Sequence, residues 1–217
     1  MKYGTRIECW GPFACFTRPE MKAERVSYDI MTPSAARGLV EAIFWHPGMK
    51  YVVDEIDLLS PIRYTNVRRN ELKSKISPSR VRSIARNGGD LSLYRQNDIQ
   101  QRAGLILRDV HYCISVHFEM TSMVNAGDNP GKFCEMLRRR ARKGQCYYRP
   151  YLGTREFAAG FALVEDDEQI VTYPETRDLG YMLYDMDYRD PQNMTPGFFH
   201  AILVNGVLDL RNCEVCQ

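Results

Sequence analysis

The strongest constraint on the fold is the alternation of residue types between Asp109 and Met120, in the segment DVHYCISVHFEM. Every second position is apolar or aromatic: Tyr112, Ile114, Val116 and Phe118. The positions between them hold His111, Cys113, Ser115 and His117. A period of two is typical of a β-strand with one buried face. No carboxylate or thiol has a metal-ligand spacing to the two histidines, so we expect them on the exposed face of a sheet.

A capped helix precedes this strand in the chain. Thr32 is suited to the N-cap and Pro33 to the first helical position. Apolar residues then recur with helical spacing up to Trp45, and His46-Pro47-Gly48 ends the run. A second helix follows the turn Asn129-Pro130-Gly131. It places Phe133, Met136 and Leu137 on one face, and Gly144 stops it.

Further strands are predicted around these elements, at residues 5–10 with a continuation at 13–17 after Gly11-Pro12, and at 51–59, 62–67 and 151–163. Residues 68–102 show no lasting period and read as a long basic loop. The order is βαββαβ, which predicts an α+β, ferredoxin-like domain over residues 1–165 with a basic insertion at about 68–102. Residues 166–217 are expected to form a small antiparallel β subdomain, with a hairpin turn at Asn205-Gly206.

Charge is strongly segregated along the chain. Residues 61–108 hold eleven lysines and arginines against three acidic residues, and residues 131–155 hold eight against one. Residues 156–217 hold three against twelve. A basic half indicates a polyanionic partner, and the acidic tail either has another task or offsets charge. The candidate RNA-binding residues are Arg63, Arg68, Arg69, Arg138, Arg139, Arg142 and Lys143, because guanidinium and ammonium groups bind phosphates.

Several classes of protein are disfavoured. The chain has no run of about 18 apolar residues and no signal-peptide core at its start, so we expect a cytoplasmic protein without membrane contact. The seven cysteines are odd in number and scattered, apart from one CxxC at Cys213 and Cys216, so we expect thiols and neither a metal nor a cofactor. Nucleotide-loop and zinc-protease motifs are absent from the sequence.

Without a carboxylate cluster, a metal-free route to RNA cleavage remains. The 2′-hydroxyl of the substrate attacks the neighbouring phosphate, and the protein supplies a base, an acid and a cation. Lys132, on the glycine turn, is our candidate for the cation.

Five segments of the chain carry a resemblance to a known family. They are CFTRPEMKAERVSYDIMTPSAARGLVEAIFWHP, PIRYTNVRRNE, NPGK with RRRARKGQ, YLGTREF and RDLGYMLYDMD. The chain resembles the CRISPR RNA-processing endoribonucleases of type I-C systems, the Cas five family, subtype d, over nearly its whole length. The resemblance implies a ferredoxin-like, RAMP-type fold with a C-terminal β subdomain. It also implies metal-independent cleavage of precursor CRISPR RNA at the repeat hairpin, after which the 5′ handle stays bound while the interference complex assembles.

The family's catalytic positions are only partly kept. The family lysine matches Lys132, but the histidine that usually follows it is Phe133 here, and the tyrosine or histidine near the end of the first helix is Phe44. Phenylalanine transfers no proton, so His46 is the candidate substitute. The alternative is a subunit that binds the RNA handle without cutting it, with non-specific binding to duplex DNA as a further option. Restoring an imidazole at position 133 should restore cleavage, unless Phe133 belongs to the apolar face of its helix.

Overall fold

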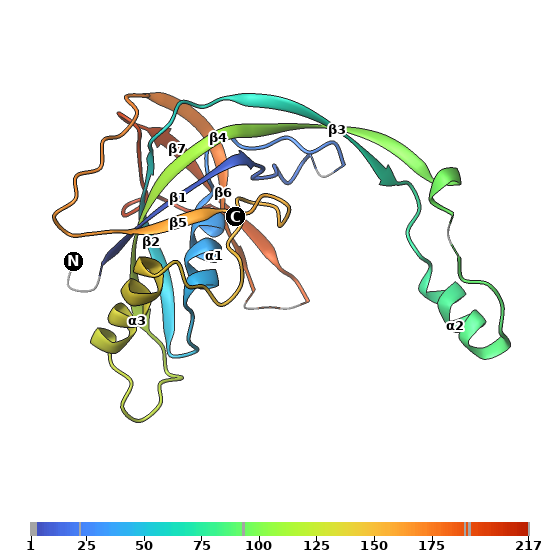
Figure 1. Cartoon of the computed structure of the whole chain (residues 1–217), viewed down its shortest axis with the longest axis horizontal. Helices are drawn as coiled ribbons and strands as arrows, with labels where there is room; N and C mark the ends of the chain where they lie inside the picture. The colour runs from blue at the N-terminus through green and yellow to red at the C-terminus, as the bar shows by residue number, and fades with distance from the viewer. Residues whose placement is uncertain (1–3, 22, 93, 189, 191, 217) are drawn as a thin grey trace.

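The computed structural model describes residues 4–21, 23–92, 94–188, 190 and 192–216 of the 217-residue chain. Helices and strands alternate in the first two thirds, and strands alone follow (Figure 1). The strands are β1 (Thr5–Ala14), β2 (Met49–Leu58), β3 (Tyr64–Leu72), β4 (Ile99–Met120), β5 (Gly160–Val164), β6 (Arg177–Asp187), β7 (Thr195–Leu203) and β8 (Val207–Asp209). The helices are α1 (Pro33–Ile43), α2 (Pro78–Asn87), the 3₁₀ turn η1 (Arg95–Asn97) and α3 (Pro130–Arg142).

The main sheet has the strand order β5-β1-β4-β2-β8, with every neighbouring pair antiparallel. The alternating segment predicted from the sequence is confirmed as the central part of β4, which lies between β1 and β2. Its alternate residues Tyr112, Ile114 and Val116 are buried in the core, as the period of two requires. The fold is thus a mixed helix and strand structure with antiparallel sheets.

Helices α1 and α3 close the core on the buried face of this sheet. Thr32 caps α1 by accepting a hydrogen bond from the Ala35 N–H at 3.3 Å, and Asn129 caps α3 through the Lys132 N–H at 2.9 Å. Proline is in the first turn of both helices, as predicted for α1. The predicted turn Asn129-Pro130-Gly131 is instead the N-cap and first two residues of α3. In α3 the side chains of Phe133 and Leu137 are buried, and Met136 packs against the core. Gly144 follows the helix with φ +63°, a conformation that favours glycine.

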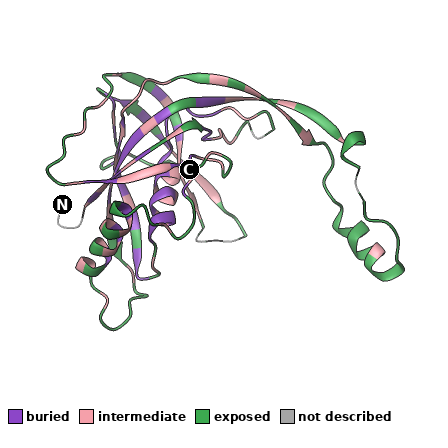
Figure 2. Cartoon of the chain, in the orientation of Figure 1, coloured by how far each residue is buried: buried purple, intermediate pink, exposed green. Residues whose placement is uncertain are grey.

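The segment 68–102 corrects the sequence prediction, because it is an arm with regular structure and not a loop. Strand β3 runs to Leu72, α2 spans Pro78–Asn87, and β4 begins at Ile99, so β3 and β4 form a long hairpin. Figure 1 shows α2 at the far end of this arm, away from the rest of the chain. No residue of α2 is buried, and Figure 2 shows the arm as mostly exposed. The residues of β3 alternate between exposed and half-buried, but the half-buried positions include polar and charged residues such as Thr65, Arg69 and Glu71, so the strand carries no apolar period.

Two smaller corrections concern the neighbouring strands β1 and β5. Gly11-Pro12 does not divide the first strand, since β1 is continuous from Thr5 to Ala14. The strand predicted at 151–163 is much shorter: only Gly160–Val164 forms β5, and Tyr151 makes an isolated bridge to Ala158.

The C-terminal part contains the two-stranded sheet β6–β7 and then returns to the main sheet. The predicted turn is confirmed at Asn205 and Gly206, which have φ +48° and +79°. It leads into β8, which pairs with β2. Helix α1 also packs against β6. A division of the chain near residue 165 stays a prediction. Among the described residues, no helix is long and apolar enough to cross a membrane.

Candidate active site

All four positions that the sequence singled out for catalysis meet in one corner of the fold. Phe44 is the C-cap of α1 and His46 lies two residues further on, while Lys132 and Phe133 lie in the first turn of α3. The ring centroids of Phe44 and Phe133 are 6.1 Å apart, and those of His46 and Phe133 are 4.9 Å apart. Segments about ninety residues apart in sequence therefore build one site.

Phe44 and Phe133 belong to the core of this corner. Their exposed fractions are 3% and 1%. Phe133 also contacts Phe118, with ring centroids 6.3 Å apart. The Arg140 guanidinium lies 5.3 Å above the Phe44 ring and donates a 3.0 Å hydrogen bond to the Ile43 carbonyl. The two phenyl rings fix the packing of α1 on α3 and offer no proton to a substrate.

Lys132 keeps its ammonium group at the surface beside a buried carboxylate. Its side chain is 49% exposed, and Nζ donates a 2.8 Å hydrogen bond to Asp128 Oδ1. The Asp128 side chain is only 4% exposed, and its Oδ2 also accepts from the Asn125 N–H at 2.9 Å. The hydrogen bond from Lys132 lowers the pKa of Asp128, and the Asn125 N–H acts in the same direction. Asp128 is therefore a carboxylate whose negative charge faces Lys132.

His46 completes the cluster from the other side of Asp128. Its Nδ1 accepts a hydrogen bond from the Gly48 N–H at 3.0 Å, so in the neutral ring the proton is on Nε2. Nε2 lies 3.8 Å from Asp128 Oδ2, and the imidazole is 27% exposed. A Cβ at Gly48 would come within 3.1 Å of Nδ1, so this close approach suits glycine. The carboxylate of Asp128 thus lies between a cation and an imidazole.

The end of β4 holds the turn His46-Pro47-Gly48 in place. The Thr121 N–H donates to the Gly48 carbonyl at 3.0 Å, and Thr121 Oγ1 donates to the Pro47 carbonyl at 2.6 Å. Because Thr121 follows β4 directly, the position of His46 depends on the central strand of the sheet as well as on α1.

The sequence analysis missed Asp128. A single carboxylate in a turn has no recognisable pattern, and the only available signal was its spacing of four residues from Lys132 at the start of a helix.

Four basic residues at the end of α3, one of them the C-cap Lys143, fall into two pairs with different surroundings. Arg142 Nε lies 2.7 Å from Glu165 Oε1, and Arg138 bonds Asp166 at 2.9 Å and Glu165 at 3.4 Å. The acidic stretch that follows β5 therefore neutralises this side of α3. Arg139 and Lys143 are exposed and form no ion pair with any residue that the structure describes.

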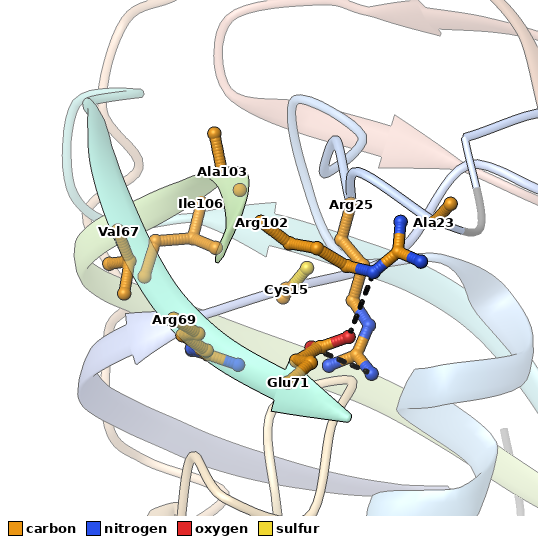
Figure 3. A pocket seen from close by; sticks show the side chains of 10 residues that line it. Cys15, Ala23, Arg25, Val67, Arg69, Glu71, Arg102, Ala103 and Ile106 are labelled. Carbon is orange, nitrogen blue, oxygen red and sulfur yellow. Dashed lines mark ion pairs between the residues drawn. The ribbon is translucent and has the colours of Figure 1, made fainter. Parts of the chain in front are cut away.

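The candidate RNA-binding residues in and beside β3 also differ in whether a carboxylate neutralises them. Arg63 and Arg68 are exposed. Arg69 instead forms an ion pair with Glu156, and its guanidinium lies 5.5 Å from the centre of the Phe157 ring. Figure 3 shows the base of the arm, where Arg25 and Arg102 both pair with Glu71. The cavity between these side chains measures about 20 Å³, room for about one water molecule. It is a packed ion-pair cluster that joins the arm to the loop between β1 and α1.

The histidines of β4 lie on the exposed face of the sheet, as predicted. His111 Nε2 lies 2.6 Å from Glu8 Oε1, and His117 Nδ1 lies 2.9 Å from both carboxylate oxygens of Asp54. Each imidazole is thus engaged with one carboxylate. Within the described ranges no group of three or more His, Cys, Asp or Glu residues is arranged to hold a metal ion.

Comparison with known proteins agrees with the resemblance. A family model described as "CRISPR-associated protein (Cas_Cas5)", subtype Cas5d, matches residues 5–211. The chain is 49% identical over 212 residues to the "CRISPR pre-crRNA endoribonuclease Cas5d" of Mannheimia succiniciproducens, covering 94% of this chain and 93% of that protein.

Solved structures share the fold. One described as "Crystal Structure of CRISPR-associated Protein" has a TM-score of 0.71 at 24% identity and covers 99% of this chain and 96% of its own. A chain of a "CRISPR RNA-guided surveillance complex" has a TM-score of 0.51 at 12% identity, with 98% and 91% covered. On the extent of the family match and the identity to its relative, this chain belongs to the Cas5d family of CRISPR-associated proteins.

Proposed function

We propose that this chain is a metal-independent endoribonuclease that cleaves precursor CRISPR RNA at its repeat hairpin. It then stays bound to the 5′ handle of the mature CRISPR RNA, in the cytoplasm, as a subunit of the type I-C interference complex. The observation that carries this proposal is the meeting of Lys132 and His46 at Asp128, in the corner that also holds positions 44 and 133. The name of the Mannheimia relative supports the same reaction.

The reaction is an internal transfer of the phosphoryl group. The 2′-oxygen attacks the adjacent phosphorus, its proton leaves to a base, and the bond from phosphorus to the 5′-oxygen breaks as that oxygen gains a proton. The products are a 2′,3′-cyclic phosphate and a 5′-hydroxyl. Lys132 Nζ stabilises the charge of the phosphorane. The neutral His46 ring carries its proton on Nε2 while Nδ1 accepts from the Gly48 N–H. His46 therefore transfers one of the two protons only after that hydrogen bond is released, and water transfers the other.

The surface around the corner supplies a path for the RNA strand. Arg139 and Lys143 on α3 are free of ion pairs with the described residues and lie on the same helix as Lys132. Arg63 and Arg68 extend the basic surface along β3. Arg69, Arg138 and Arg142 contribute less in our proposal, because acidic neighbours already neutralise them. The same phosphate contacts would serve duplex DNA non-specifically.

The proposed architecture is ferredoxin-like, of the RAMP type. The order β5-β1-β4-β2 corresponds to the order 4-1-3-2 of the four strands in a βαββαβ unit, with α1 and α3 as its two helices. In this view β3, α2 and the first part of β4 are an insertion between the second and third strands.

A second candidate function is binding of the handle without cleavage. Its support is the replacement of two proton-transferring groups by Phe44 and Phe133, which are both buried. Under this reading Lys132 is one more contact to phosphate.

One experiment separates the two functions. Purified protein is incubated with cognate repeat RNA in EDTA, and the products are analysed for one defined cut with a cyclic phosphate end. We expect cleavage that survives chelation and falls about 100-fold in Lys132→Ala, with nearly unchanged binding. Lys143→Ala is the matched control, and it should weaken binding more than the rate. No cut in the wild-type protein would favour the binding function, and a cut that requires magnesium would contradict the proposed chemistry.

A further inference from the structure

The exposed face of the main sheet carries a cavity far along β4 from the catalytic corner. Glu8 and Trp10 alternate with the buried residues Ile7 and Cys9, so they lie on the face opposite the helices. The cavity is a shallow depression wide open to solvent, with a volume of about 550 Å³, and it lies between the second half of β1 and the middle of β4. Its walls include Glu8, Trp10, Asp109 and His111. Nothing in the proposed cleavage reaction uses these residues.

Trp10 forms a fixed aromatic wall of this cavity. Its side chain is 42% exposed although it lies within a sheet. It pairs across the sheet with Gly160 on one side and His111 on the other. A Cβ at Gly160 would lie 2.6 Å from the indole, so the ring rests directly on the glycine backbone. The His111 ring meets Trp10 edge to face at 6.1 Å. One side of the indole is thereby supported, and the ring remains accessible from the cavity.

The polar part of the cavity is acidic. Glu8 Oε1 bonds His111 Nε2, and Asp109 adds a second carboxylate, while no lysine or arginine lines this cavity in the described part of the chain. Burial raises the pKa of the nearby Asp57 to about 6, and Asp57 lies in the same cross-strand row as Glu8. An RNA phosphate entering here would meet only repulsion from these carboxylates. A guanidinium group instead stacks on indole and forms paired hydrogen bonds with a carboxylate.

We propose that this face is a docking surface for a protein partner, and that the cavity receives an arginine side chain of that partner. The guanidinium lies over the Trp10 ring and bonds the Glu8 carboxylate, with Asp109 adding favourable charge. RNA and protein then occupy different sides of the chain: RNA follows the basic corner and arm, and the partner covers the acidic sheet face. The inference rests on the proposed role as a subunit of a larger complex.

A photo-crosslinking experiment tests the cavity directly. The full chain with benzoylphenylalanine in place of Trp10 is assembled with CRISPR RNA and the other subunits of the complex, and the crosslinked product is sequenced by mass spectrometry. We expect a crosslink to a protein segment within about two residues of an arginine. A crosslink to RNA, to a segment without arginine, or no crosslink in the assembled complex would overturn the proposal.

The same photo-reactive residue at Tyr147, which is 82% exposed just after α3, tests the RNA path separately. A failure at Tyr147 would count against the proposed RNA path and not against the cavity. Recovery of the complex with the unmodified chain tests the subunit role itself.

A pair of charge reversals gives an independent measurement. Glu8→Lys should reduce the amount of co-purified partner subunits at least about tenfold, because it places a second cation against the incoming arginine. Glu24→Lys makes the same change of charge at an exposed position outside the cavity and should leave recovery unchanged. RNA cleavage by the isolated chain should be equal in both variants, which shows that they are folded. Equal recovery of partner subunits with Glu8→Lys and Glu24→Lys would contradict the proposal.

Discussion

Asp128 joins the two ionisable groups of the proposed catalytic corner, Lys132 and His46. Its carboxylate is 4% exposed, accepts a hydrogen bond from Lys132 Nζ and lies 3.8 Å from His46 Nε2. Such a carboxylate orients both groups without touching the substrate, as the orienting acids of other catalytic sites do.

We expect Asp128→Asn to lower the single-turnover cleavage rate about tenfold or more while RNA affinity stays nearly constant. The amide keeps an oxygen for the Asn125 N–H but loses the charge between Lys132 and His46. The measurement is the rate across pH 5.5 to 9, where a positioning role also changes the shape of the profile. An Asn variant with the wild-type rate and profile would show that Asp128 only stabilises the turn.

Phe133 shows how burial changes a prediction made from sequence. Resemblance to the family suggested that an imidazole at this position would restore cleavage. The side chain is 1% exposed and packs against Phe44, Phe118 and His46, so a histidine there would be inside the core.

We therefore expect Phe133→His to destabilise the protein by about 1–3 kcal/mol and to leave the cleavage rate unchanged. Thermal melting and single-turnover kinetics on the same preparation decide the matter. A faster rate with an unchanged melting temperature would contradict this expectation. It would mean that a side chain at position 133 reaches the RNA, as the resemblance to the family implies.

At the scale of elements, helix α3 has a neutralised side and a free side. Arg138 and Arg142 pair with Glu165 and Asp166, whereas Arg139 and Lys143 face solvent without ion pairs among the described residues. The chain therefore offers two double variants with the same loss of charge on one helix.

The double variant Arg139→Ala with Lys143→Ala should weaken RNA binding and lower the log–log salt slope by roughly 1.4, at roughly 0.7 per lost phosphate contact. Arg138→Ala with Arg142→Ala should change the slope much less, because those guanidinium groups already have carboxylate partners. Affinities at several salt concentrations provide the comparison. If both pairs reduce the slope equally, RNA displaces the acidic segment from α3.

The sequence predicted some elements well and others not at all, for physical reasons. Helix α1 was predicted from the cap Thr32, the proline after it and one apolar face, and helix α3 from its apolar face and the stop at Gly144. Most of the arm was missed because the half-buried positions of β3 include charged residues and α2 buries nothing, so neither carries an apolar period. The resemblance identified Lys132 and the positions of Phe44 and Phe133, but Asp128 needed the spatial arrangement. The pairing of Arg138 and Arg142 with the acidic segment also depends on contacts across 23 or more residues of sequence.

At the scale of the whole molecule, the acidic sheet face affects stability as well as binding. Burial raises the pKa of Asp57 from its ordinary value near 3.8 to about 6, and Glu55 adds to the effect. The folded state therefore disfavours the ionised carboxylate. This penalty is absent below about pH 4, grows as pH rises, and is complete above about pH 6.

Asp57→Asn should accordingly raise the free energy of unfolding at pH 7, by about 1 kcal/mol after allowance for partial solvent exposure, and should have no such effect near pH 4. Denaturant titrations at the two pH values measure the difference. Asp209→Asn is the control: that carboxylate has a lowered pKa because of its hydrogen bonds with Arg211, so its loss should not stabilise the protein. An equal gain at both pH values would point to an effect of the amide itself and not of charge.

Strand β4 has 22 residues and contributes to two parts of the fold: residues 107–120 pair with β1 and β2 in the sheet, and residues 99–107 pair with β3 in the arm, where Leu105 also bridges to Val26. Side chains on a strand repeat every two residues, so removing matched pairs of residues from both strands at the arm tip leaves the facing and pairing of all remaining residues unchanged. The length of the arm can therefore drift in evolution, or be set by an engineer, in steps of two residues without rebuilding the core. A step of one residue per strand would leave the remaining strand residues as they are but would turn the tip, with α2, toward the opposite face of the arm.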